Sequence, residues 1–437
     1  MVSPQNHFVF TPLLPSAAVG TLESRCIQEP VRSILSTNGT YLQAKARTVD
    51  VANKKVICES LDNEVFEVNY DKLVIAVGVK TNTFGIKSIS EMAQKNDSVF
   101  FLKRLQHART IRGHIIDMFE KASIPTVSGA ERRRLLSFLV VGGGPTSCEF
   151  TAELHGTIVG IPAYSHCLMH SIVSPDFVKQ DVKRLYADLL PFVKITLAEA
   201  GPALLGPFDK ALQDYVQGLF KKRDIDVRLT TAVTSVEEFS PEGYRFPPAK
   251  RALLSDGNQL EFGTMIWSAG LAPRTFTQDL QDDVFVKHPR TKRLVVDEFL
   301  RVKGHEGSVW AIGDAAINES GAPLPQLAQV ARQEGIFLAK VMNGEIREDA
   351  EPFRFFSLGS MAFIGELKGI YDGSSAGPLR DPSETRQTWM PPALKGLSAF
   401  FMWRFAYWGR QTSITNKILI PMYWFKTFIF GRDTSRY

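Results

Sequence analysis

The feature that most constrains this chain is a glycine-rich turn about a third of the way along it. Residues 135–141 form an apolar run with a single serine and lead directly into Gly142-Gly143-Gly144-Pro145. A helical stretch over 149–154 follows. A strand, a glycine turn and a helix in this order predict a dinucleotide-binding unit, although a tight turn without a ligand is the simpler alternative.

The residues of this turn have separate expected roles. Gly142 makes the tight turn, and Gly144 allows the backbone to approach a pyrophosphate. The N-terminus of the new helix adds free N–H groups and the positive end of a dipole. Ser147 stands where a third glycine is usual, and its small side chain still allows the helix to pack closely on the strand.

The expected partner of the turn is an acidic residue at the end of the next strand. Residues 193–198 form such a strand, and Glu199 ends it. A carboxylate there binds the adenosine ribose hydroxyls and would repel the extra phosphate of NADP, so it favours NAD. Glu199 lies much farther from Gly142 than the usual ~20 residues. The alternative is that Glu199 binds no ligand and simply ends an exposed strand.

The flanking segments extend this unit and indicate part of a second one. Short β-branched runs within 41–77 predict a meander that leads to a buried strand ending at Gly78. A second meander over 227–262 leads to a strand that ends at Ala269 and Gly270. The chain therefore shows one complete unit, 135–270, and the second half of another, 41–78.

The sequence makes two further predictions for the segments between these units. Apolar residues spaced by three and four predict a helix over 99–123. The arginines at 132–134 are expected to lie on a solvated approach to the following strand rather than in a ligand site.

Composition excludes several classes of protein. The four cysteines fall at no metal-ligand or CxxC spacing, so the sequence predicts reduced thiols and no metal site. No apolar stretch approaches the ~18–20 residues that cross a bilayer. The net charge of +5 fits anionic ligands or anionic lipid. Outside the C-terminal segment, no basic patch with interleaved aromatic residues indicates nucleic-acid binding.

The C-terminal segment has the composition of a helix that lies on a membrane surface. It holds three of the six tryptophans, and lysines and arginines are interspersed. Its apolar residues recur at spacings of three and four: Ile414, Ile418, Met422, Phe425 and Ile429. Pro421 is expected to kink or break this helix. A packed core or a dimer contact is the alternative interpretation of the stripe.

A set of short motifs runs in order along nearly the whole chain. They are Phe8 to Pro15, Gly20 to Glu23, Tyr70 to Gly78, the glycine turn with Glu149 and Glu153, Trp310 to Ala315, Ala328 to Gln333, and Phe430 to Asp433. Together they closely resemble the mitochondrial type II (alternative, non-proton-pumping) NADH dehydrogenases.

The resemblance implies an α/β flavoprotein with two Rossmann-like dinucleotide-binding domains, one for FAD and one for NADH, and a C-terminal amphipathic region that associates with a membrane. It implies hydride transfer from NADH to FAD, followed by two-electron reduction of ubiquinone, without proton pumping. The implied location is the mitochondrial inner membrane, as a peripheral protein, and a homodimer is implied as well. The absence of a redox-active cysteine pair argues against a disulfide reductase of the same architecture.

The resemblance also implies the site residues. Gly313 and Asp314, after a strand over 309–312, would bind the ribitol and pyrophosphate region of FAD. Gln329 and Gln333 lie on one face of a helix and would be the catalytic residues beside flavin and quinone. Two exposed glutamines are the simpler alternative. The other expected cofactor-binding residues are Gly142, Gly144, Glu149, Glu199, Ala269, Gly270, Thr11, Pro12 and Gly78.

The motifs also predict how the chain is divided. The expected parts are an N-terminal part of the FAD domain at 1–134, an NADH domain at 135–270, a C-terminal part of the FAD domain with the quinone-site helix at 271–390, and a membrane-associating region at 391–437.

The sequence departs from the family pattern in two places. The family has a first strand and glycine motif for FAD ahead of residue 8, and this sequence shows neither, which puts its retention of FAD in doubt. An incomplete gene model is the preferred interpretation; a flavin-free, NADH-binding membrane-surface protein is the alternative. Residues 156–175 interrupt an otherwise continuous helix and lengthen the path to Glu199. They are interpreted as a retained intron read in frame, with a real surface loop as the alternative.

Overall fold

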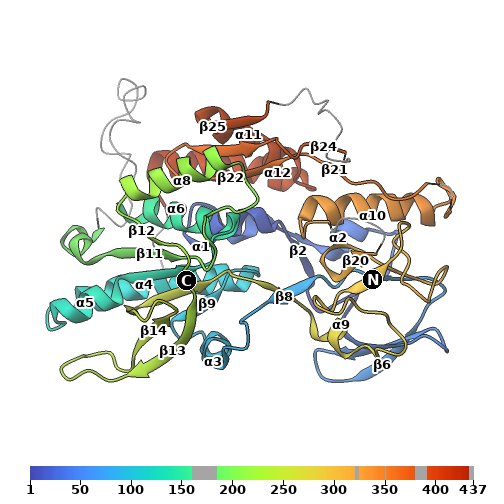
Figure 1. The fold of residues 1–437 in the computed structure, drawn as a ribbon, viewed down its shortest axis with the longest axis horizontal. Coiled ribbons are helices and arrows are strands. Elements are labelled where there is room, and N and C mark those ends of the chain that lie inside the picture. The colour runs from blue at the N-terminus through green and yellow to red at the C-terminus, as the bar shows by residue number, and fades with distance from the viewer. Residues whose placement is uncertain (160–184, 320–323, 350, 379–390, 433–437) are drawn as a thin grey trace.

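Two α/β lobes lie side by side, and a C-terminal unit covers one side of both (Figure 1). The computed structural model describes residues 1–159, 185–319, 324–349, 351–378 and 391–432. Within these ranges, no helix is both long and apolar enough to cross a membrane.

A parallel sheet of five strands forms the core of the first lobe. Its order is β12-β11-β10-β16-β9, and every neighbouring pair is parallel. The strands are β9 (Val99–Phe101), β10 (Ser137–Val141), β11 (Lys194–Ala198), β12 (Asp226–Arg228) and β16 (Thr264–Trp267). Because the carboxyl ends of parallel strands meet at one edge, the glycine turn after β10 and Glu199 after β11 lie at the same edge.

Helices and a hairpin sheet cover this lobe. The helices are α3 (Lys87–Lys95), α4 (Leu105–Ser123), α5 (Gly129–Leu135), α6 (Pro145–Val159) and α8 (Lys210–Lys222). The hairpin strands are β13 (Val233–Phe239), β14 (Ala249–Leu254) and β15 (Gln259–Phe262). The predicted insertion begins inside α6, and its residues 160–175 lie outside the described ranges.

The helix predicted over 99–123 is wrong at its start. Residues 99–101 form strand β9, which pairs with β16, and α4 begins at Leu105. Val99 and Phe100 are buried, because β9 completes the parallel sheet against α3 and α4. The unit predicted at 135–270 therefore shares its sheet with residues from the N-terminal part.

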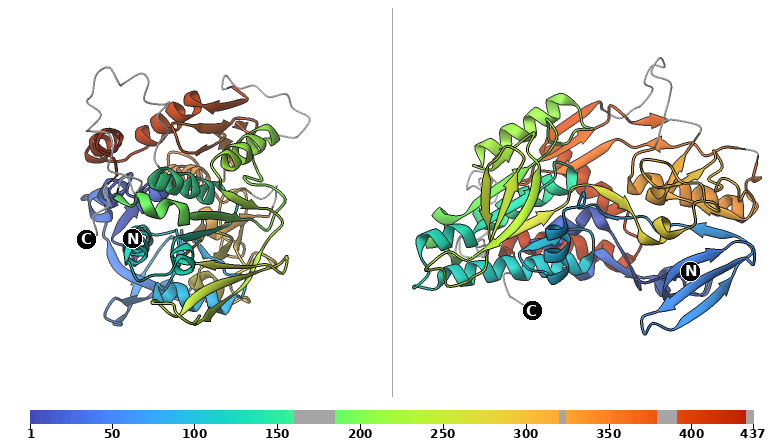
Figure 2. Two further views of the ribbon diagram at one scale, coloured as in Figure 1. Left: turned by 90° about the vertical axis from the view of Figure 1, so that its left-hand side faces the viewer. Right: turned by 60° about the horizontal axis from the view of Figure 1, so that its bottom comes forward.

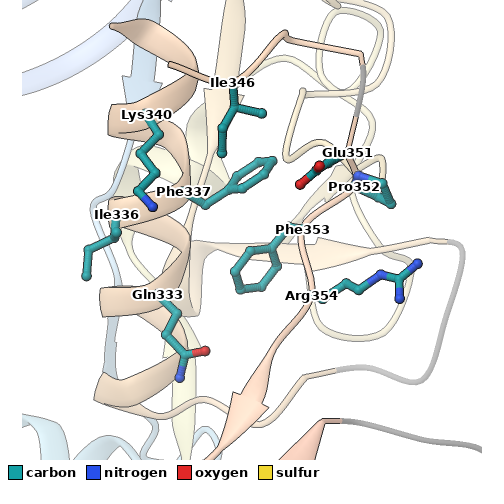
Figure 3. Close-up of a pocket in the computed structure, with 9 residues that line it drawn as sticks. All are labelled: Gln333, Ile336, Phe337, Lys340, Ile346, Glu351, Pro352, Phe353 and Arg354. Atoms are coloured by element: carbon teal, nitrogen blue, oxygen red, sulfur yellow. The ribbon is translucent and has the colours of Figure 1, made fainter. Parts of the chain in front are cut away.

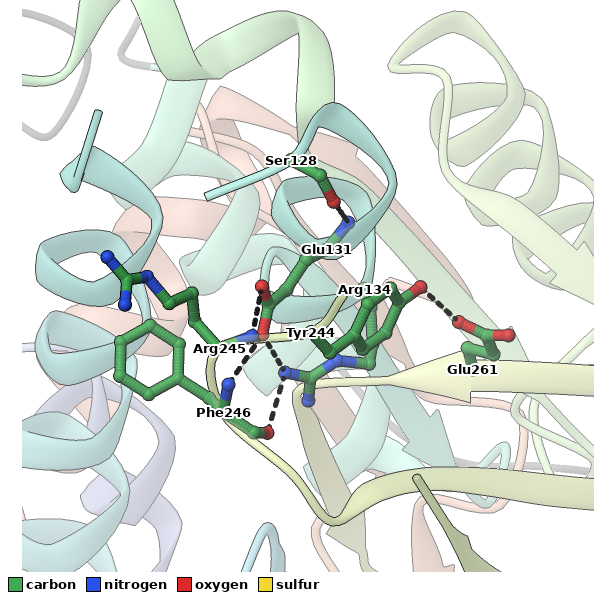
Figure 4. Close-up of polar contacts among 7 residues, drawn as sticks. All are labelled: Ser128, Glu131, Arg134, Tyr244, Arg245, Phe246 and Glu261. Atoms are coloured by element: carbon green, nitrogen blue, oxygen red, sulfur yellow. Dashed lines mark hydrogen bonds and ion pairs between the residues drawn. The ribbon is translucent and has the colours of Figure 1, made fainter. Parts of the chain in front are cut away.

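The solvated position expected for the arginines at 132–134 is wrong for Arg134. Helix α5 begins after Ser128, whose hydroxyl accepts the N–H of Glu131 (Figure 4). The buried Glu131 carboxylate accepts the N–H groups of Arg245 and Phe246 and pairs with Arg134. Arg134 is 5% exposed and also donates to the carbonyl of Phe246, so it anchors the β13–β14 loop to α5.

The second lobe combines the predicted meander with two short parallel pairs. The meander consists of β4 (Leu42–Asp50), β5 (Lys55–Ser60) and β6 (Val65–Asn69), with β1 (Val2–Ser3) beside β4. The parallel pairs are β7 (Leu73–Ile75) with β19 (Val309–Ala311), and β18 (Leu294–Val296) with β20 (Ala316–Asn318). The remaining elements of this lobe are β2 (His7–Val9), β3 (Gln28–Pro30), α2 (Val31–Leu35), α9 (Thr275–Asp279) and α10 (Ala328–Met342). Helix α1 (Leu14–Ala18) packs instead on α4 and α6 of the first lobe.

Two antiparallel strands carry the chain between the lobes. Strand β8 (Val79–Thr81) leaves the second lobe after Gly78, and β17 (Leu271–Pro273) returns to it after Gly270. Figure 1 shows β8 at the middle of the molecule, between the lobes. The two glycines that end the predicted buried strands therefore lie at the junction of the lobes.

The C-terminal unit is a small sheet with two helices. Its strands are β21 (Phe356–Ser357), β22 (Ser360–Phe363), β23 (Gly369–Asp372), β24 (Gly377–Pro378) and β25 (Ala393–Gly396). Helices α11 (Leu397–Gly409) and α12 (Ile414–Phe430) follow. Strands β22, β23 and β25 form one sheet that spans the expected boundary at residue 391, and α12 lies beside the N-terminal segment at 24–27 (Figure 2).

The expected break at Pro421 is wrong, because α12 continues through it. A proline inside a helix leaves the carbonyl four residues earlier without its N–H donor. That carbonyl belongs to Lys417, and the indole Nε1 of Trp408 donates to it at 2.7 Å. A side chain from α11 thus replaces the missing backbone hydrogen bond.

Candidate nucleotide and flavin sites

The glycine turn after β10 is closed on one side and open on the other. Gly142 has φ +114°, and a Cβ atom there would lie 3.1 Å from the Ala269 nitrogen. Gly144 is exposed, and no atom lies within 4 Å of the position that its Cβ would take. The turn therefore packs tightly against the end of β16 and leaves free space above Gly144, where a pyrophosphate could approach.

The start of α6 is tied to the same edge of the sheet. The hydroxyls of Ser147 and Ser268 are 2.5 Å apart, and Ser147 is fully buried. The small residue at the third position of the motif therefore links α6 to the end of β16 by a hydrogen bond, which glycine could not do. Pro145 and Thr146 at the helix N-terminus stay exposed beside Gly144.

Glu199 lies directly against the turn, as the sequence predicted. Its Oε1 accepts the N–H of Gly201 at 2.5 Å. A Cβ atom at Gly143 would lie 2.8 Å from Glu199 Oε2, so this glycine is needed to admit the carboxylate. The fold brings Gly142, Gly144 and Glu199 together at the carboxyl edge of the parallel sheet, the edge at which dinucleotide-binding folds hold their ligand.

Ala269 and Gly270 lie between the turn and the strands that cross between the lobes. Gly270 has φ +69°, and a Cβ atom there would lie 2.5 Å from Phe84 Cζ. The N–H of Asn82 donates to the Gly270 carbonyl, and the Trp267 indole donates to the Asn82 carbonyl. Gly78, which has φ +64°, begins the other crossing strand.

The second candidate site surrounds Gly313 and Asp314, at the end of β19. Gly313 has φ +66°, and its N–H donates to the buried carboxyl of Glu334 on α10. Burial raises the pKa of Asp314, and the charges of Lys103 and Arg293 oppose that rise. Burial likewise raises the pKa of Glu334.

Three basic side chains in this region were not predicted from the sequence: Lys103, Arg274 and Arg293, here called the cation group. Burial lowers the pKa of each of them. Arg274 Nε donates to the carbonyl of Val77 at 2.7 Å, next to Gly78. Arg293 is 9% exposed, and its Nε has no hydrogen-bond partner among the described residues.

Such a group fits the phosphates of a dinucleotide. Arg293 is buried, and Lys103 and Arg274 are half-buried. Cations removed from water are costly unless an anion compensates them, and Asp314 and Glu334 are the nearby carboxyls whose pKa values burial raises. The pyrophosphate of FAD would supply the missing negative charge. The only local sequence signal was that Lys103 follows β9 and Arg274 follows β17, two positions at the edge where the lobes meet.

The predicted residues Thr11 and Pro12 begin a short 3-10 helix, Thr11–Leu13, which leads into α1. Thr11 is exposed and Pro12 is half-buried. Among the described residues, no hydrogen bond or ion pair joins them to Gly78, Gly313 or the cation group.

Gln329 and Gln333 share one face of α10, as predicted, but their amides are bound to backbone. The Gln329 amide donates to the Gly359 carbonyl and accepts the N–H of Leu358. The Gln333 amide donates to the Phe356 carbonyl and accepts the N–H of the same residue. The two glutamines therefore hold the segment that begins the C-terminal unit.

A pocket of about 670 Å³ lies beyond Gln333, along the second half of α10 (Figure 3). Phe337 and Phe353 meet edge to face across it, with ring centroids 5.6 Å apart. Lys340, Glu351 and Arg354 give it a charged rim. Of the site residues predicted from the sequence, Gln333 lines this pocket. The glycine turn is not part of it.

Glu149, predicted to bind a cofactor, points to the C-terminal unit. Its Oε1 accepts the N–H of Phe363 at 3.0 Å and the indole N–H of Trp403 at 3.1 Å. Burial raises its pKa from 4.5 to about 8, and the two donated hydrogen bonds oppose that rise. The side chain therefore carries a proton at neutral pH.

No cluster of metal-ligating side chains is found in the part of the chain that the structure describes. Cys26, Cys58 and Cys148 are free and buried, as predicted for reduced thiols, and Cys167 lies outside the described ranges. Burial raises the pKa of Cys26 to about 12 and that of Cys148 further, so these thiols stay protonated and unreactive.

Comparison with known proteins identifies the family. Residues 1–335 match the model for pyridine nucleotide-disulphide oxidoreductases, and residues 357–433 match the model for the NDH2 C-terminal domain. The chain is 37% identical to a probable NADH dehydrogenase of Dictyostelium discoideum, covering all of this chain and 85% of the relative. It is 34% identical to the mitochondrial external NADH-ubiquinone oxidoreductase 2 of Saccharomyces cerevisiae, covering all of this chain and 77% of the relative.

The chain belongs to the type II NADH dehydrogenases. The NDH2 of Plasmodium falciparum in complex with NADH has a similar structure, with a TM-score of 0.80 and 25% identity over 99% of this chain and 94% of that one. The predicted family and the predicted fold class, a two-domain α/β flavoprotein fold, are confirmed.

In this type II NADH dehydrogenase, the raised pKa of Glu149 makes stability depend on pH. The folded protein holds a proton between pH 4.5 and about 8 that the unfolded chain releases, so this group's contribution to stability falls as pH rises through that window. Glu149→Gln keeps an oxygen acceptor and removes the titration. We expect the variant's stability to fall less steeply over this window, by at most about 1.4 kcal/mol per pH unit.

Urea unfolding midpoints at pH 5 to 9 measure this difference. Glu242→Gln makes the same chemical substitution at an exposed site on the same lobe and is the control. If the urea midpoints of wild type and Glu149→Gln change equally with pH, the Glu149 carboxyl does not titrate in this window and the prediction is wrong.

Proposed function

We propose that this chain is an FAD-dependent NADH:ubiquinone oxidoreductase that pumps no protons and acts as a peripheral protein of the mitochondrial inner membrane. The observation that carries the proposal is the presence of two separate sites. Glu199, after β11, lies against an open glycine turn, and the charges of Lys103 and Arg293 act on Asp314 at the end of β19. The relatives named NADH-ubiquinone oxidoreductases, several of them mitochondrial, support the substrate and the location.

The residues of the chain divide the work between the two sites. Bound FAD supplies the redox chemistry, which is hydride acceptance from NADH followed by two-electron donation to ubiquinone. Gly144 and the start of α6 would bind the NADH pyrophosphate, and Glu199 the adenosine ribose. Lys103, Arg274 and Arg293 would hold the FAD pyrophosphate, and Asp314 the ribitol hydroxyls.

Ubiquinone is proposed to bind beside α10. Gln329 and Gln333 hold residues 356–359 against this helix and so shape the wall that a quinone would contact.

The absorption spectrum and the turnover of the purified chain test this function. We expect flavin absorbance near one equivalent per chain and NADH-dependent reduction of a short-chain ubiquinone. A preparation without flavin absorbance would instead support an NADH-binding protein without catalysis.

Coenzyme preference tests the role of Glu199. Glu199→Gln removes the charge that repels the 2′-phosphate of NADPH, so we expect the ratio of kcat/KM for NADPH over NADH to rise about tenfold. Glu242→Gln should leave the ratio unchanged. An unchanged ratio in Glu199→Gln would remove Glu199 from the adenosine site.

The membrane surface is proposed to be the outer face of α11 and α12. Large apolar side chains are exposed along both helices: Leu397, Phe401, Phe405, Trp408, Ile414, Ile418, Met422, Phe425, Phe428 and Phe430. Phe405 is 65% exposed and Phe425 is 62% exposed. Lys417 and Lys426 lie on α12 among these apolar side chains. Basic residues beside an apolar face are typical of helices that bind anionic lipid interfaces.

Vesicle binding tests this surface. We expect the double variant Phe405→Ser, Phe425→Ser to bind vesicles of phosphatidylcholine and cardiolipin at least about tenfold more weakly, because each ring contributes about 1.5–3 kcal/mol when fully buried. Leu61→Ser, Val65→Ser is the matched control, since these residues are 64% and 65% exposed on the meander. Unchanged vesicle binding together with loss of a dimer would identify the face as a homodimer contact.

A further inference from the structure

Phe84 is a large apolar side chain exposed at the junction of the lobes. It lies between β8 and α3, and 63% of it is exposed. Its φ is +52°, a left-handed conformation that is uncommon and costly for a non-glycine residue. Neither property stabilises the fold, and strained residues of this kind occur most often at functional sites.

Several hydrogen bonds fix Phe84 in this conformation. Its N–H donates to Asn82 Oδ1 at 2.8 Å. Asn82 is in turn bound to the end of β16, through the Gly270 carbonyl and the Trp267 indole. The ring of Phe84 stands 6.4 Å from that of Trp267, centroid to centroid, in a tilted arrangement.

The ring rests on the backbone that borders the glycine turn. A Cβ atom at Gly270 would lie 2.5 Å from Phe84 Cζ, so the glycine makes room for the ring. The adjacent Ala269 nitrogen lies 3.1 Å from the Cβ position of Gly142, the first glycine of the turn. The backbone that packs on the turn at Ala269 therefore continues into Gly270, which is exposed and lies against the ring.

The strand order says which half of the nucleotide meets this surface. The adenosine site at Glu199 follows β11, and the pyrophosphate site at Gly144 follows β10. Strand β16 lies on the other side of β10, so the remaining half of NADH extends across its end, at residues 268–270. That half is the nicotinamide riboside.

We propose that Phe84 is a binding contact for the nicotinamide half of NADH and helps to set its position. This inference rests on the proposed function, since it takes the glycine turn as the NADH site. The exposed ring offers a flat apolar face that can stack on the nicotinamide heterocycle. Gly270, without a side chain, lets ring and nucleotide approach the same stretch of backbone.

Calorimetric titration of the purified flavoprotein with NAD and with ADP-ribose tests the proposal. Neither ligand reduces the flavin, and they differ only in the nicotinamide group. We expect Phe84→Ala to raise the Kd for NAD about 3- to 10-fold, the range of an aromatic contact. The Kd for ADP-ribose should change less than about twofold. Alanine keeps a Cβ, so the backbone preference at this position stays similar.

Three further variants make the result specific. Phe84→Tyr keeps the ring and should bind NAD as the wild type does. Glu199→Gln should weaken both ligands together, because both contain the adenosine ribose. Leu61→Ala removes an equally exposed apolar side chain far from the turn and should change neither.

The outcomes separate this inference from the proposed function. If Phe84→Ala raises the Kd for NAD and for ADP-ribose equally, or changes neither Kd, the contact with nicotinamide is overturned. Loss of flavin from Phe84→Ala would also overturn it, in favour of a contact with FAD. If the wild type binds neither NAD nor ADP-ribose, the proposed function itself fails.

Discussion

The arrangement of the whole molecule depends on a buried carboxylate in α6. Glu153 is 2% exposed and accepts hydrogen bonds from the hydroxyls of Ser16 and Thr21 at 2.6 and 2.7 Å. The guanidinium of Arg432, just after α12, lies 3.5 Å from the same carboxylate. A buried charge left without partners is strongly destabilising, and here the N-terminal segment and the residue after α12 supply the partners of Glu153.

Helix α6 thereby connects the nucleotide site to the C-terminal unit. Its first turn follows Gly144, and one and two turns farther along Glu149 and Glu153 bind α11, β22 and the end of α12. Arg404 completes this contact by lying over the rings of Phe400 and Trp424 at 4.6 and 4.4 Å. Burial lowers the pKa of Arg404 to about 10, and the charge of Glu153 opposes that fall. The NADH site and the contacts that hold the C-terminal unit thus share one helix.

The sequence predicted the parts of this structure that depend on local pattern. The glycine turn, the strand before Glu199 and the meander all follow from short-range spacing and turn chemistry. Features that depend on distant residues were missed or wrongly predicted. Lys103, Arg274 and Arg293 come from three segments that only the packing of the lobes brings together. Helix α12 continues through Pro421 because Trp408, on another helix, supplies the missing hydrogen bond. The spacing of Gln329 and Gln333 gave their common face correctly, but not the backbone that they bind.

The central claim is that the Glu153 carboxylate holds α12 and the C-terminal unit on α6. Hydrogen exchange of the α12 amides in Glu153→Ala, compared with wild type, tests it most directly, with α8 as an internal reference on the same lobe. Loss of this partner leaves Arg432 without its buried carboxylate, so we expect exchange in α12 to become at least about tenfold faster while α8 changes little. Unchanged exchange in α12, or an equal increase in both helices, would contradict the claim.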